Sequence, residues 1–385
     1  MRDEGRRMKD AGEIMVVAGE VSGDMHAAKV VSALRRRLPG ARFFGIGGDN
    51  MRAEGVDILY HVRDMAVTGL SEVLLRFPFF LRVYKDMVRR IRNRRPDLAL
   101  FVDYPGFNLR LAGAAHKAGI RTAYYICPQV WAWHRSRVKK IAGAVDTLIT
   151  IFPFEEDLFK GTGLNVKFAG HPLAGDARRG GGNSPSDLPW KGQCRVALLP
   201  GSRTNEVERL LPSFLSAAEF ITAEKPESSF ILAAASQEME EIIRRKLKSA
   251  AERAPVEVVA GKTREVLRQA HGAILASGTA TLEASLMKCP MVIAYRMAPL
   301  SYAVLRRLVR VEHMGMVNIV AGRRVCPELV QGEVTGRKLA EALGPLLQEG
   351  PERSRMVTEL SRVNDALGGP GAEERAADAI LEGMG

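Results

Sequence analysis

The run Pro200–Glu208, PGSRTNEVE, has the composition of a turn that binds an anion. It follows an apolar strand candidate, and Gly201 permits a tight turn into a helix. Ser202 or Thr204 is placed to cap that helix, whose first N–H groups are available to phosphate oxygens. Arg203 adds a planar guanidinium suited to the same oxygens. A plain capped helix would have the same pattern, and the run lacks the lysine spacing of a Walker loop.

A second turn of this kind is Ser277–Glu283, SGTATLE, which also stands between a strand candidate and a helix candidate. Small residues let a ligand approach the backbone, and Ser277 and Thr279 offer hydroxyl and N–H groups to a diphosphate. Glu283 could accept hydrogen bonds from a ribose diol. The alternative is an N-cap followed by an acid that favours the positive end of the helix dipole.

Two further groups of acids follow strands in the first half of the chain. Glu20, Ser22 and Asp24 lie on one tight turn in Ala18–Asp24, AGEVSGD. Asp103 directly follows another apolar run, so its carboxylate is expected at the edge of the sheet where ligands bind. A carboxylate there could act as a general base. The alternative is an aspartate that only caps its turn.

The run Pro128–Arg137, PQVWAWHRSR, combines aromatic and cationic side chains. An aromatic ring suits a sugar face and a guanidinium suits a phosphate, so Trp133, Arg135 and Arg137 are candidate acceptor contacts. His171, in the sequence GHP, is a further candidate. A core aromatic corner and a structural histidine are the competing interpretations.

The segment 66–96 combines an apolar cluster with an unusual density of positive charge. Between Arg76 and Arg95 there are eight basic residues and one acid, Asp86. Such a segment suits the interface of an anionic membrane, although an ordinary amphipathic helix packed on the sheet would look similar. The candidate membrane-facing residues are Val67, Leu70, Leu74, Phe77 and Phe80.

Composition limits the class of protein. The formal net charge of +12 favours anionic partners, and 46% apolar residues indicate a globular chain. The four cysteines have no metal-ligand spacing, the N-terminus lacks the apolar core of a signal peptide, and no apolar run is long enough to span a bilayer. We therefore expect a soluble or peripheral protein of the reducing cytosol.

Short apolar runs alternate with helical patterns along most of the 385 residues. This alternation predicts doubly wound α/β sheets, and two halves that both open with a strand, a glycine turn and a helix predict two similar domains. The strand candidates are 14–18, 43–47, 98–102, 122–126, 146–152, 195–199, 230–235, 256–259, 273–276 and 291–295. The expected parts are an acceptor- and membrane-facing domain 1–176, a linker 177–191, a nucleotide domain 192–345 and a C-terminal helical segment 346–385 that packs back on the first domain.

Taken together, the motifs resemble those of the lipid-A-disaccharide synthase family. Their order and spacing carry the resemblance, from about residue 14 to the C-terminal region. They are AGEVSGD (18–24), GIGGDNMRAEG (45–55), VTGLSEVL (67–74), VDYPGFN (102–108), PQVWAW (128–133), FAGHPLAGD (168–176), LLPGSRTNEVE (198–208), SGTATLEAS (277–285), KCPMVIAYR (288–296) and NIVAGRRVCPELVQ (318–331).

The resemblance implies the GT-B fold, with two Rossmann-like doubly wound domains facing a central cleft. It implies inverting transfer from UDP-2,3-diacylglucosamine to the 6-hydroxyl of 2,3-diacylglucosamine 1-phosphate, giving a β-1,6-linked disaccharide 1-phosphate and UDP. It also implies a cytoplasmic protein, peripheral on the inner face of the inner membrane. We expect no cofactor, no metal and no nucleic-acid partner, and a homodimer is left open.

The resemblance also assigns roles to residues. Asp103 would be the base, and some members of the family carry a second aspartate where this chain has Gly106. Glu20 and Ser22 would lie near the reacting sugar and complete the catalytic candidates. The residues implied at UDP are Ser202, Arg203, Glu206, Ser277, Gly278, Thr279, Glu283, Asn318 and Gln331.

Two other functions fit part of these observations. Another GT-B enzyme of UDP-GlcNAc, a 2-epimerase or a peptidoglycan-type transferase, would share the loops but needs no surface for acyl chains. A non-enzymatic basic protein that binds membranes would explain the charge but neither the paired glycine turns nor Asp103. The apolar segment and the acid at the strand end therefore favour the acyl-sugar transferase.

Overall fold

The computed structural model describes residues 12–65, 70–131, 137–179, 187–249, 256–299, 301–303 and 312–384, without the side chains of 70–74, 176–179 and 249. By their internal contacts these residues form two compact units. The first contains Met1–Pro172 with Gly368–Gly385, and the second contains Leu173–Leu367. Each unit has its own parallel sheet and its own apolar core.

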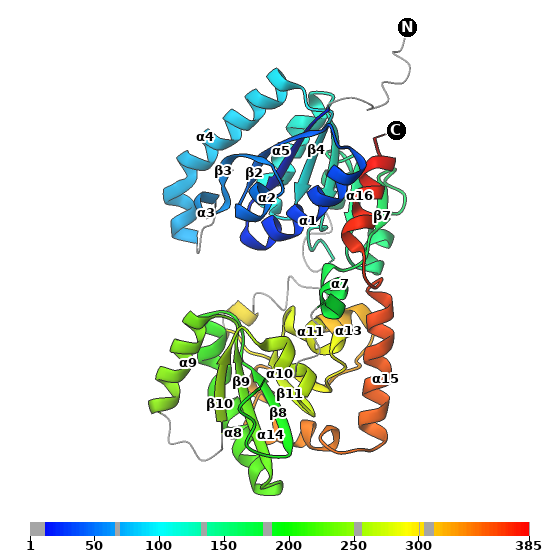
Figure 1. Cartoon of the computed structure of the whole chain (residues 1–385). Helices are drawn as coiled ribbons and strands as arrows, with labels where there is room; N and C mark the ends of the chain where they lie inside the picture. The colour runs from blue at the N-terminus through cyan, green and yellow to red at the C-terminus, as the bar shows by residue number, and fades with distance from the viewer. Residues whose placement is uncertain are drawn as a thin grey trace. The chain divides into compact units, whose positions relative to one another are not determined.

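The first unit is built on a seven-stranded sheet in the order β3-β2-β1-β4-β5-β6-β7 (Figure 1). Its strands are β1 (Glu13–Ala18), β2 (Arg42–Gly47), β3 (Asp57–His61), β4 (Leu98–Val102), β5 (Arg121–Tyr125), β6 (Thr147–Thr150) and β7 (Asn165–Phe168). Its helices are α1 (Val21–Arg37), α2 (Asp49–Ala53), α3 (Val62–Met65), α4 (Leu70–Arg94), α5 (Pro105–Lys117), α6 (Arg137–Ala142), η1 (Pro153–Phe159) and α16 (Ala372–Glu382). The central strand β4, LALFV, is buried at every position, as a strand covered by helices on both faces must be.

The second unit repeats this plan with a six-stranded sheet in the order β10-β9-β8-β11-β12-β13. Its strands are β8 (Cys194–Leu199), β9 (Ser228–Ala234), β10 (Val256–Ala260), β11 (Gly272–Ala276), β12 (Met291–Tyr295) and β13 (Glu328–Val330). Its helices are α8 (Thr204–Glu224), α9 (Gln237–Ser249), α10 (Thr263–Gln269), α11 (Ala280–Leu286), α13 (Met316–Ala321), η2 (Gln331–Glu333), α14 (Gly336–Leu343), η3 (Gly344–Leu346) and α15 (Pro351–Ala366), while α7 (Pro172–Arg179) begins at the division between the units.

Both sheets confirm the doubly wound fold that the sequence predicts. All strand pairs in the described residues are parallel. In each sheet the order reverses beside the first strand, between β1 and β4 and again between β8 and β11. Ligands of doubly wound sheets bind outside the carboxyl ends of the strands at such a switch point.

Helix α4 contains most of the apolar and basic segment 66–96. It begins at Leu70 and continues through Pro78. Proline removes one backbone hydrogen bond, but packing of an apolar face supplies most of the stability of a helix in a protein. Here Val83, Met87 and Ile91 are fully buried in the first core.

The C-terminal segment divides between the two units. Helix α16, near the C-terminus, lies beside α1, near the N-terminus (Figure 1). Arg37 of α1 forms ion pairs with Glu374 and Asp378 of α16. Helix α15 packs with α11 in the second unit, where the Ser285 hydroxyl donates to Asn364 Oδ1 at 2.9 Å. Only α16, and not the whole of 346–385, therefore belongs to the first unit, and part of the expected linker 177–191 lies outside the described residues.

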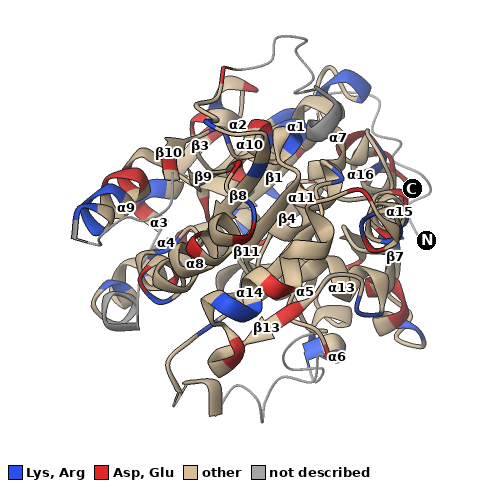
Figure 2. Ribbon diagram, turned by 90° about the horizontal axis from the view of Figure 1, so that it is seen from below, with Lys and Arg blue, Asp and Glu red and all other residues tan. Residues whose placement is uncertain are grey.

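Charge is distributed unevenly among the helices. Figure 2 shows both signs on α9, where Glu240 and Arg244 form an ion pair at 2.7 Å. Helix α6, RVKKIA, carries basic residues and no acid. The positive charge of the chain is thus locally balanced on some helices and unopposed on others.

Candidate functional site

Asp103 lies at the switch point of the first sheet, directly after β4 and next to β1. Its φ of +48° and the φ of +52° at Tyr104 put two consecutive non-glycine residues in the left-handed region, which is costly and occurs mainly at functional turns. Three hydrogen bonds hold the Asp103 backbone: its N–H donates to Tyr125 O at 3.0 Å, and its carbonyl accepts from Tyr124 Oη at 2.6 Å and Asn108 Nδ2 at 2.7 Å. The surrounding fold therefore holds the Asp103 backbone in this left-handed conformation.

Tyr104 connects this turn to the turn after β1. Its ring covers Gly19 so closely that a Cβ there would lie 2.1 Å from the ring, and its hydroxyl donates to Met65 O at 3.1 Å. Burial raises the pKa of Tyr104, and the nearby Glu20 carboxylate raises it further. Asp103 and Glu20 are thus both at this edge of the sheet, and Ser22 lies exposed at the start of α1.

Asp103 lines a cavity of about 460 Å³, whose lining also includes Gln129, Arg137 and Glu155. Burial raises the pKa of the Asp103 carboxyl, while the Tyr104 N–H that it accepts partly offsets the rise. A raised pKa makes a carboxylate a stronger base, as a general base requires. The cavity can therefore receive a hydroxyl group next to a carboxylate and a cation.

Glu155 is an acid of this cavity that sequence reasoning missed. It is 1% exposed, and its Oε2 accepts the N–H groups of Ile151 and Phe152 at 3.2 and 3.1 Å. Burial raises the pKa of Glu155 to about 8, against the lowering effect of those N–H groups and the Trp131 indole. The only sequence signal was a Pro-Phe-Glu-Glu turn after an apolar run.

The raised pKa of Glu155 predicts a stability that falls with pH. Between pH 4.5, the ordinary value, and about 8, the folded chain keeps a proton that the unfolded chain releases. The stability that the folded chain owes to the protonated Glu155 is complete below pH 4.5 and is lost as the pH rises from 4.5 to about 8. We expect Glu155→Gln, which keeps the acceptor oxygen, to gain unfolding free energy relative to wild type from pH 5 to pH 8 in urea titrations. Parallel pH profiles for the two proteins would contradict this.

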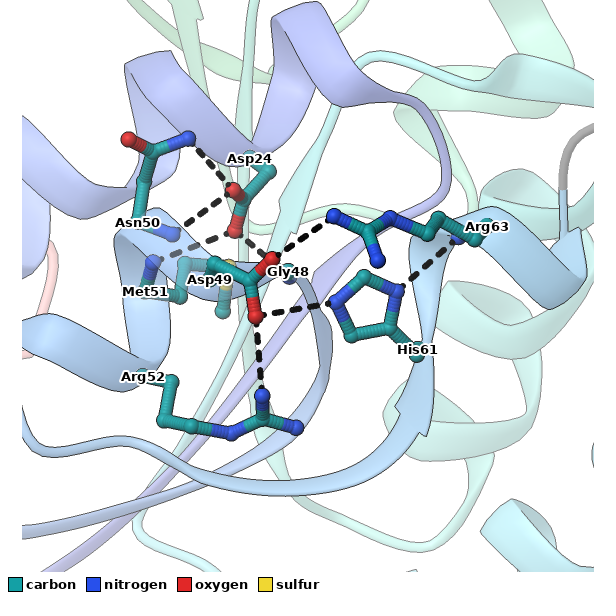
Figure 3. Close-up of polar contacts among 8 residues, drawn as sticks. All are labelled: Asp24, Gly48, Asp49, Asn50, Met51, Arg52, His61 and Arg63. Atoms are coloured by element: carbon teal, nitrogen blue, oxygen red, sulfur yellow. Dashed lines mark hydrogen bonds and ion pairs between the residues drawn. The ribbon is translucent and has the colours of Figure 1, made fainter.

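Asp24, the third acid of AGEVSGD, has a structural role (Figure 3). Its carboxylate is 1% exposed and accepts the N–H groups of Gly48 at 2.6 Å, Asn50 at 3.1 Å and Met51 at 3.1 Å, with Asn50 Nδ2 at 2.8 Å. It therefore satisfies the free N–H groups at the start of α2. Asp49 beside it points to the surface, where it meets Arg52, His61 and Arg63.

The four acceptor candidates separate in the structure. Arg137 is exposed and lines the Asp103 cavity, whereas Trp133 and Arg135 lie outside the described residues. His171 is 7% exposed and packs with its ring centroid 5.1 Å from that of Phe152. Burial, followed by the charge of His26, lowers the pKa of His171 to about 4, so the ring is neutral near pH 7.

A second cavity, of about 200 Å³, lies at the switch point of the other sheet, beyond β8, β9 and β11. Six of the nine residues predicted at UDP line it: Ser202, Glu206, Ser277, Gly278, Thr279 and Glu283. Arg264, which the sequence did not suggest, pairs with Glu283 at 3.1 Å. Two separate runs, Pro200–Glu208 and Ser277–Glu283, thus form one cavity within the second unit.

The turn before α8 is not capped by Ser202 or Thr204. The N-cap residue is Arg203, without a side-chain cap, and Glu206 Oε2 instead accepts the Ser202 N–H at 3.1 Å. Glu206 Oε1 meets Arg203 Nη1 at 3.0 Å, and the Arg203 side chain is 81% exposed. Gly201, with φ +126°, is required because a Cβ would lie 2.5 Å from Glu206. Arg203, also predicted at UDP, does not line the cavity itself, but its guanidinium pairs with Glu206, which does.

Three residues predicted at UDP, Ser277, Gln331 and Asn318, have internal bonds that the sequence could not show. Ser277 donates its N–H to Ala294 O at 3.0 Å and its hydroxyl to Met314 O at 2.5 Å, so neither donor is free for a diphosphate. Gln331 pairs its amide with both backbone groups of Met297, at 2.8 and 3.2 Å, and does not line the cavity.

Asn318, the third of these residues, has the most internal side-chain hydrogen bonds. It is fully buried, its Nδ2 donates to Cys326 O and Glu328 Oε1, and its Oδ1 accepts the N–H groups of Val325 and Cys326. An amide with all its bonding capacity used has none for a ligand. Asn318 therefore holds the loop before β13 rather than contacting the cavity.

Comparison with known proteins identifies the family. The model of a family described as lipid-A-disaccharide synthetase matches residues 14–379. The chain belongs to the lipid-A-disaccharide synthase family. Proteins named lipid-A-disaccharide synthase are 42% identical in Syntrophus aciditrophicus over 372 residues (96% of this chain, 97% of that one) and 40% identical in Myxococcus xanthus over 384 residues (97% and 98%). The chain is thus a UDP-sugar glycosyltransferase of lipid A assembly, as its motifs predict.

Solved structures confirm the fold of this family member as GT-B. A calicheamicin glycosyltransferase superposes with a TM-score of 0.59 at 17% identity, covering 97% of this chain and 98% of the other. A UDP-GlcNAc 2-epimerase of Neisseria meningitidis gives 0.58 at 11% identity, covering 97% and 99%. At such identities the likeness concerns the fold alone.

The surface of α4 in this lipid-A-disaccharide synthase family member carries exposed apolar side chains. Leu75 is 81% exposed, Phe77 55% and Leu81 39%. Phe80 is half-buried, Val67 is outside the described residues, and the side chains of Leu70 and Leu74 are not described. Among the described residues no helix is long and apolar enough to cross a membrane, and no three His, Cys, Asp or Glu side chains group as metal ligands.

Proposed function

We propose that the chain transfers diacylglucosamine from UDP-2,3-diacylglucosamine to the 6-hydroxyl of 2,3-diacylglucosamine 1-phosphate. The products are a β-1,6-linked disaccharide 1-phosphate and UDP. The observation that carries this proposal is Asp103, whose backbone is held by hydrogen bonds and whose side chain lines a cavity at the switch point of the first sheet. Family membership supports both substrate identities.

In the proposed reaction, the acceptor oxygen attacks the anomeric carbon of the donor from the face opposite UDP. Its proton passes to the Asp103 carboxylate, while the bond from the anomeric carbon to the β-phosphate oxygen breaks and its electron pair leaves with UDP. One new glycosidic bond forms with inverted configuration. Arg137, exposed in the Asp103 cavity, is a candidate contact for the acceptor phosphate.

The UDP moiety is proposed to occupy the cavity of the second unit. Its departing negative charge would be stabilised by the first N–H groups of the long helix α8 and by Arg203. Ser202, Glu206, Gly278, Thr279 and Glu283 line this cavity and are retained as candidate contacts. Asn318 and the Ser277 hydroxyl are not, because their bonds are internal.

Arg203→Ala is expected to weaken UDP binding by about 1 kcal/mol or more, roughly fivefold in Kd, because charge-assisted bonds to the diphosphate are lost. Titration calorimetry with UDP measures the effect. The matched control is Arg209→Ala, an exposed arginine of α8. Neither arginine lines the cavity itself, but Arg203 pairs with Glu206, which does. Equal UDP affinities of the two variants would remove Arg203 from the site.

We also propose that the protein works at the inner face of the cytoplasmic membrane, with the exposed apolar residues of α4 in the lipid interface. Leu75, Phe77 and Leu81 would enter the acyl region, and exposed cations of the same helix, such as Arg82 and Lys85, would meet anionic headgroups. Both proposed substrates carry acyl chains, which supports a membrane as the place of exchange.

UDP release separates this function from its alternatives. It should be measured with the donor alone, with the acylated acceptor added, and with a deacylated acceptor added. We expect rapid release only with the acylated acceptor. Turnover of UDP-GlcNAc without any second sugar would instead indicate an epimerase, and no turnover of any sugar nucleotide would indicate a binding protein.

A further inference from the structure

A groove of about 750 Å³ lies between α4 and α5 in the first unit, outside the two cavities described above. Its volume falls within the range of roughly 300–1,000 Å³ that is usual for small-molecule sites. Side chains of both helices form its apolar lining, among them Phe80, Tyr84, Val88 and Phe107. The remaining wall comes from Lys140, Gly143 and Ala144.

The charge of this groove has one sign. Its cations are Arg92, Arg110, Lys117 and Lys140, and no acid lines it. All four are exposed, and none forms an ion pair or side-chain hydrogen bond with another residue in the described parts of the chain. An apolar groove with unopposed cations is complementary to an amphiphile that has an alkyl chain and an anionic head.

The groove and the Asp103 cavity share their supporting helices. On α5, Pro105 lines the cavity and Phe107 lines the groove. On α6, Arg137 lines the cavity and Lys140 lines the groove. The Phe107 ring lies 6.3 Å from that of Tyr104, beside Asp103, and 6.2 Å from that of Tyr84 in the groove. From Phe107 to Lys117 the groove follows α5 for about 15 Å at 1.5 Å per residue.

We propose that this groove binds an acyl chain of the sugar acceptor while the acceptor hydroxyl lies at Asp103. The inference rests on the proposed function and assigns an acyl subsite to it. A substrate acyl chain is favoured over a bilayer lipid because the groove starts one helical turn from the cavity that holds the candidate base. Lys140, three residues after Arg137 of the Asp103 cavity, would attract the acceptor phosphate and keep the sugar end of the molecule near that cavity.

Gly113 provides a direct way to fill the groove. It lies on α5 in the groove wall, and a Cβ there would meet Ala144 Cβ at 3.8 Å, an ordinary contact. Gly113→Leu fills the space at a helical position where leucine is favoured over glycine, while Gly113→Ala adds only the Cβ. The pair therefore tests occupancy of the groove with a matched control for the backbone change.

The measurement is the KM of detergent-dispersed 2,3-diacylglucosamine 1-phosphate, together with kcat at saturation and the Kd of UDP. We expect Gly113→Leu to raise KM at least about tenfold with kcat and UDP affinity unchanged, because about two methylenes lost from the groove already account for a tenfold change. Gly113→Ala should stay within about twofold. Unchanged KM in a folded Gly113→Leu variant would overturn the proposal.

A charge variant keeps the test valid if Gly113→Leu does not fold. Lys140→Gln should raise the acceptor KM, whereas Lys139→Gln, its exposed neighbour that does not line the groove, should not. Equal KM values for these two variants would count against the groove.

Two further arms separate the proposal from its alternatives. Sedimentation with phosphatidylglycerol–phosphatidylethanolamine vesicles distinguishes the source of the chain: if Gly113→Leu loses vesicle binding but keeps the acceptor KM, the occupant is a bilayer lipid and the proposal fails. Acceptor binding is also measured without donor. Wild-type protein that binds the acceptor with chain-length dependence but releases no UDP would refute the proposed function while retaining the groove.

Discussion

Asp103→Asn is expected to lower kcat by about 10²–10⁴-fold, the usual contribution of a general base. The variant keeps the size of the side chain and one oxygen that can accept the Tyr104 N–H, but it cannot take the acceptor proton. UDP affinity should remain within about twofold because the candidate UDP cavity lies in the second unit. Steady-state UDP release and UDP calorimetry on the same preparations measure both quantities.

The control is Asp157→Asn, an exposed acid paired with Lys160 that does not line the Asp103 cavity. It should retain wild-type turnover. In wild type, kcat/KM should fall as the pH drops through the pKa of Asp103, which burial raises above its ordinary 3.8, since only the carboxylate can accept the proton. Turnover of Asp103→Asn within tenfold of wild type would exclude Asp103 as the base.

Asp24→Ala is expected to cost about 3 kcal/mol of unfolding free energy, because buried N–H groups of Gly48 and Met51 lose their acceptor. At about 2–4 °C per kcal/mol, its melting temperature should fall by roughly 6–12 °C. Asp49→Ala is the matched control next to it in Figure 3, since Asp49 is 59% exposed and its ion pairs are at the surface. That change should cost less than about 1 kcal/mol.

Calorimetric or urea unfolding of the two alanine variants measures this difference. If Asp24→Ala melts like wild type but loses activity, the AGEVSGD turn uses Asp24 for chemistry rather than for capping α2. If both variants lose the same unfolding free energy, the buried hydrogen bonds of Asp24 contribute no more stability than the surface ion pairs of Asp49.

The fold was largely predictable because central parallel strands are apolar at nearly every position. All ten predicted strands occur, with ends that differ by up to two residues. The three that were missed, β3, β7 and β13, are all edge strands with half-buried or exposed side chains. An edge strand contributes few buried residues, so its sequence, such as NVKF in β7, shows no apolar run.

The site was predictable in position but not in bonding. Asp103 after β4 located the first cavity, and the glycine turns after β8 and β11 located the second, because turn chemistry is local in sequence; Glu20 and Ser22 do not line the first cavity. What each polar atom contacts depends on segments far apart in the chain, as with Asn318 and Glu328 or Gln331 and Met297. Glu155 was missed for the same reason, since its burial beside Asp103 is a property of the folded sheet.

The most direct test of the central claim is the structure of the product. Purified wild-type protein should be incubated with UDP-2,3-diacylglucosamine and 2,3-diacylglucosamine 1-phosphate, and the lipid product examined by mass spectrometry and by the NMR coupling of its new anomeric proton. We expect a tetra-acylated disaccharide 1-phosphate with a β-1,6 linkage, formed in equal amount to the released UDP and at least about 100-fold more slowly with Asp103→Asn. Release of UDP without a disaccharide, or a product with an α linkage, would contradict the account.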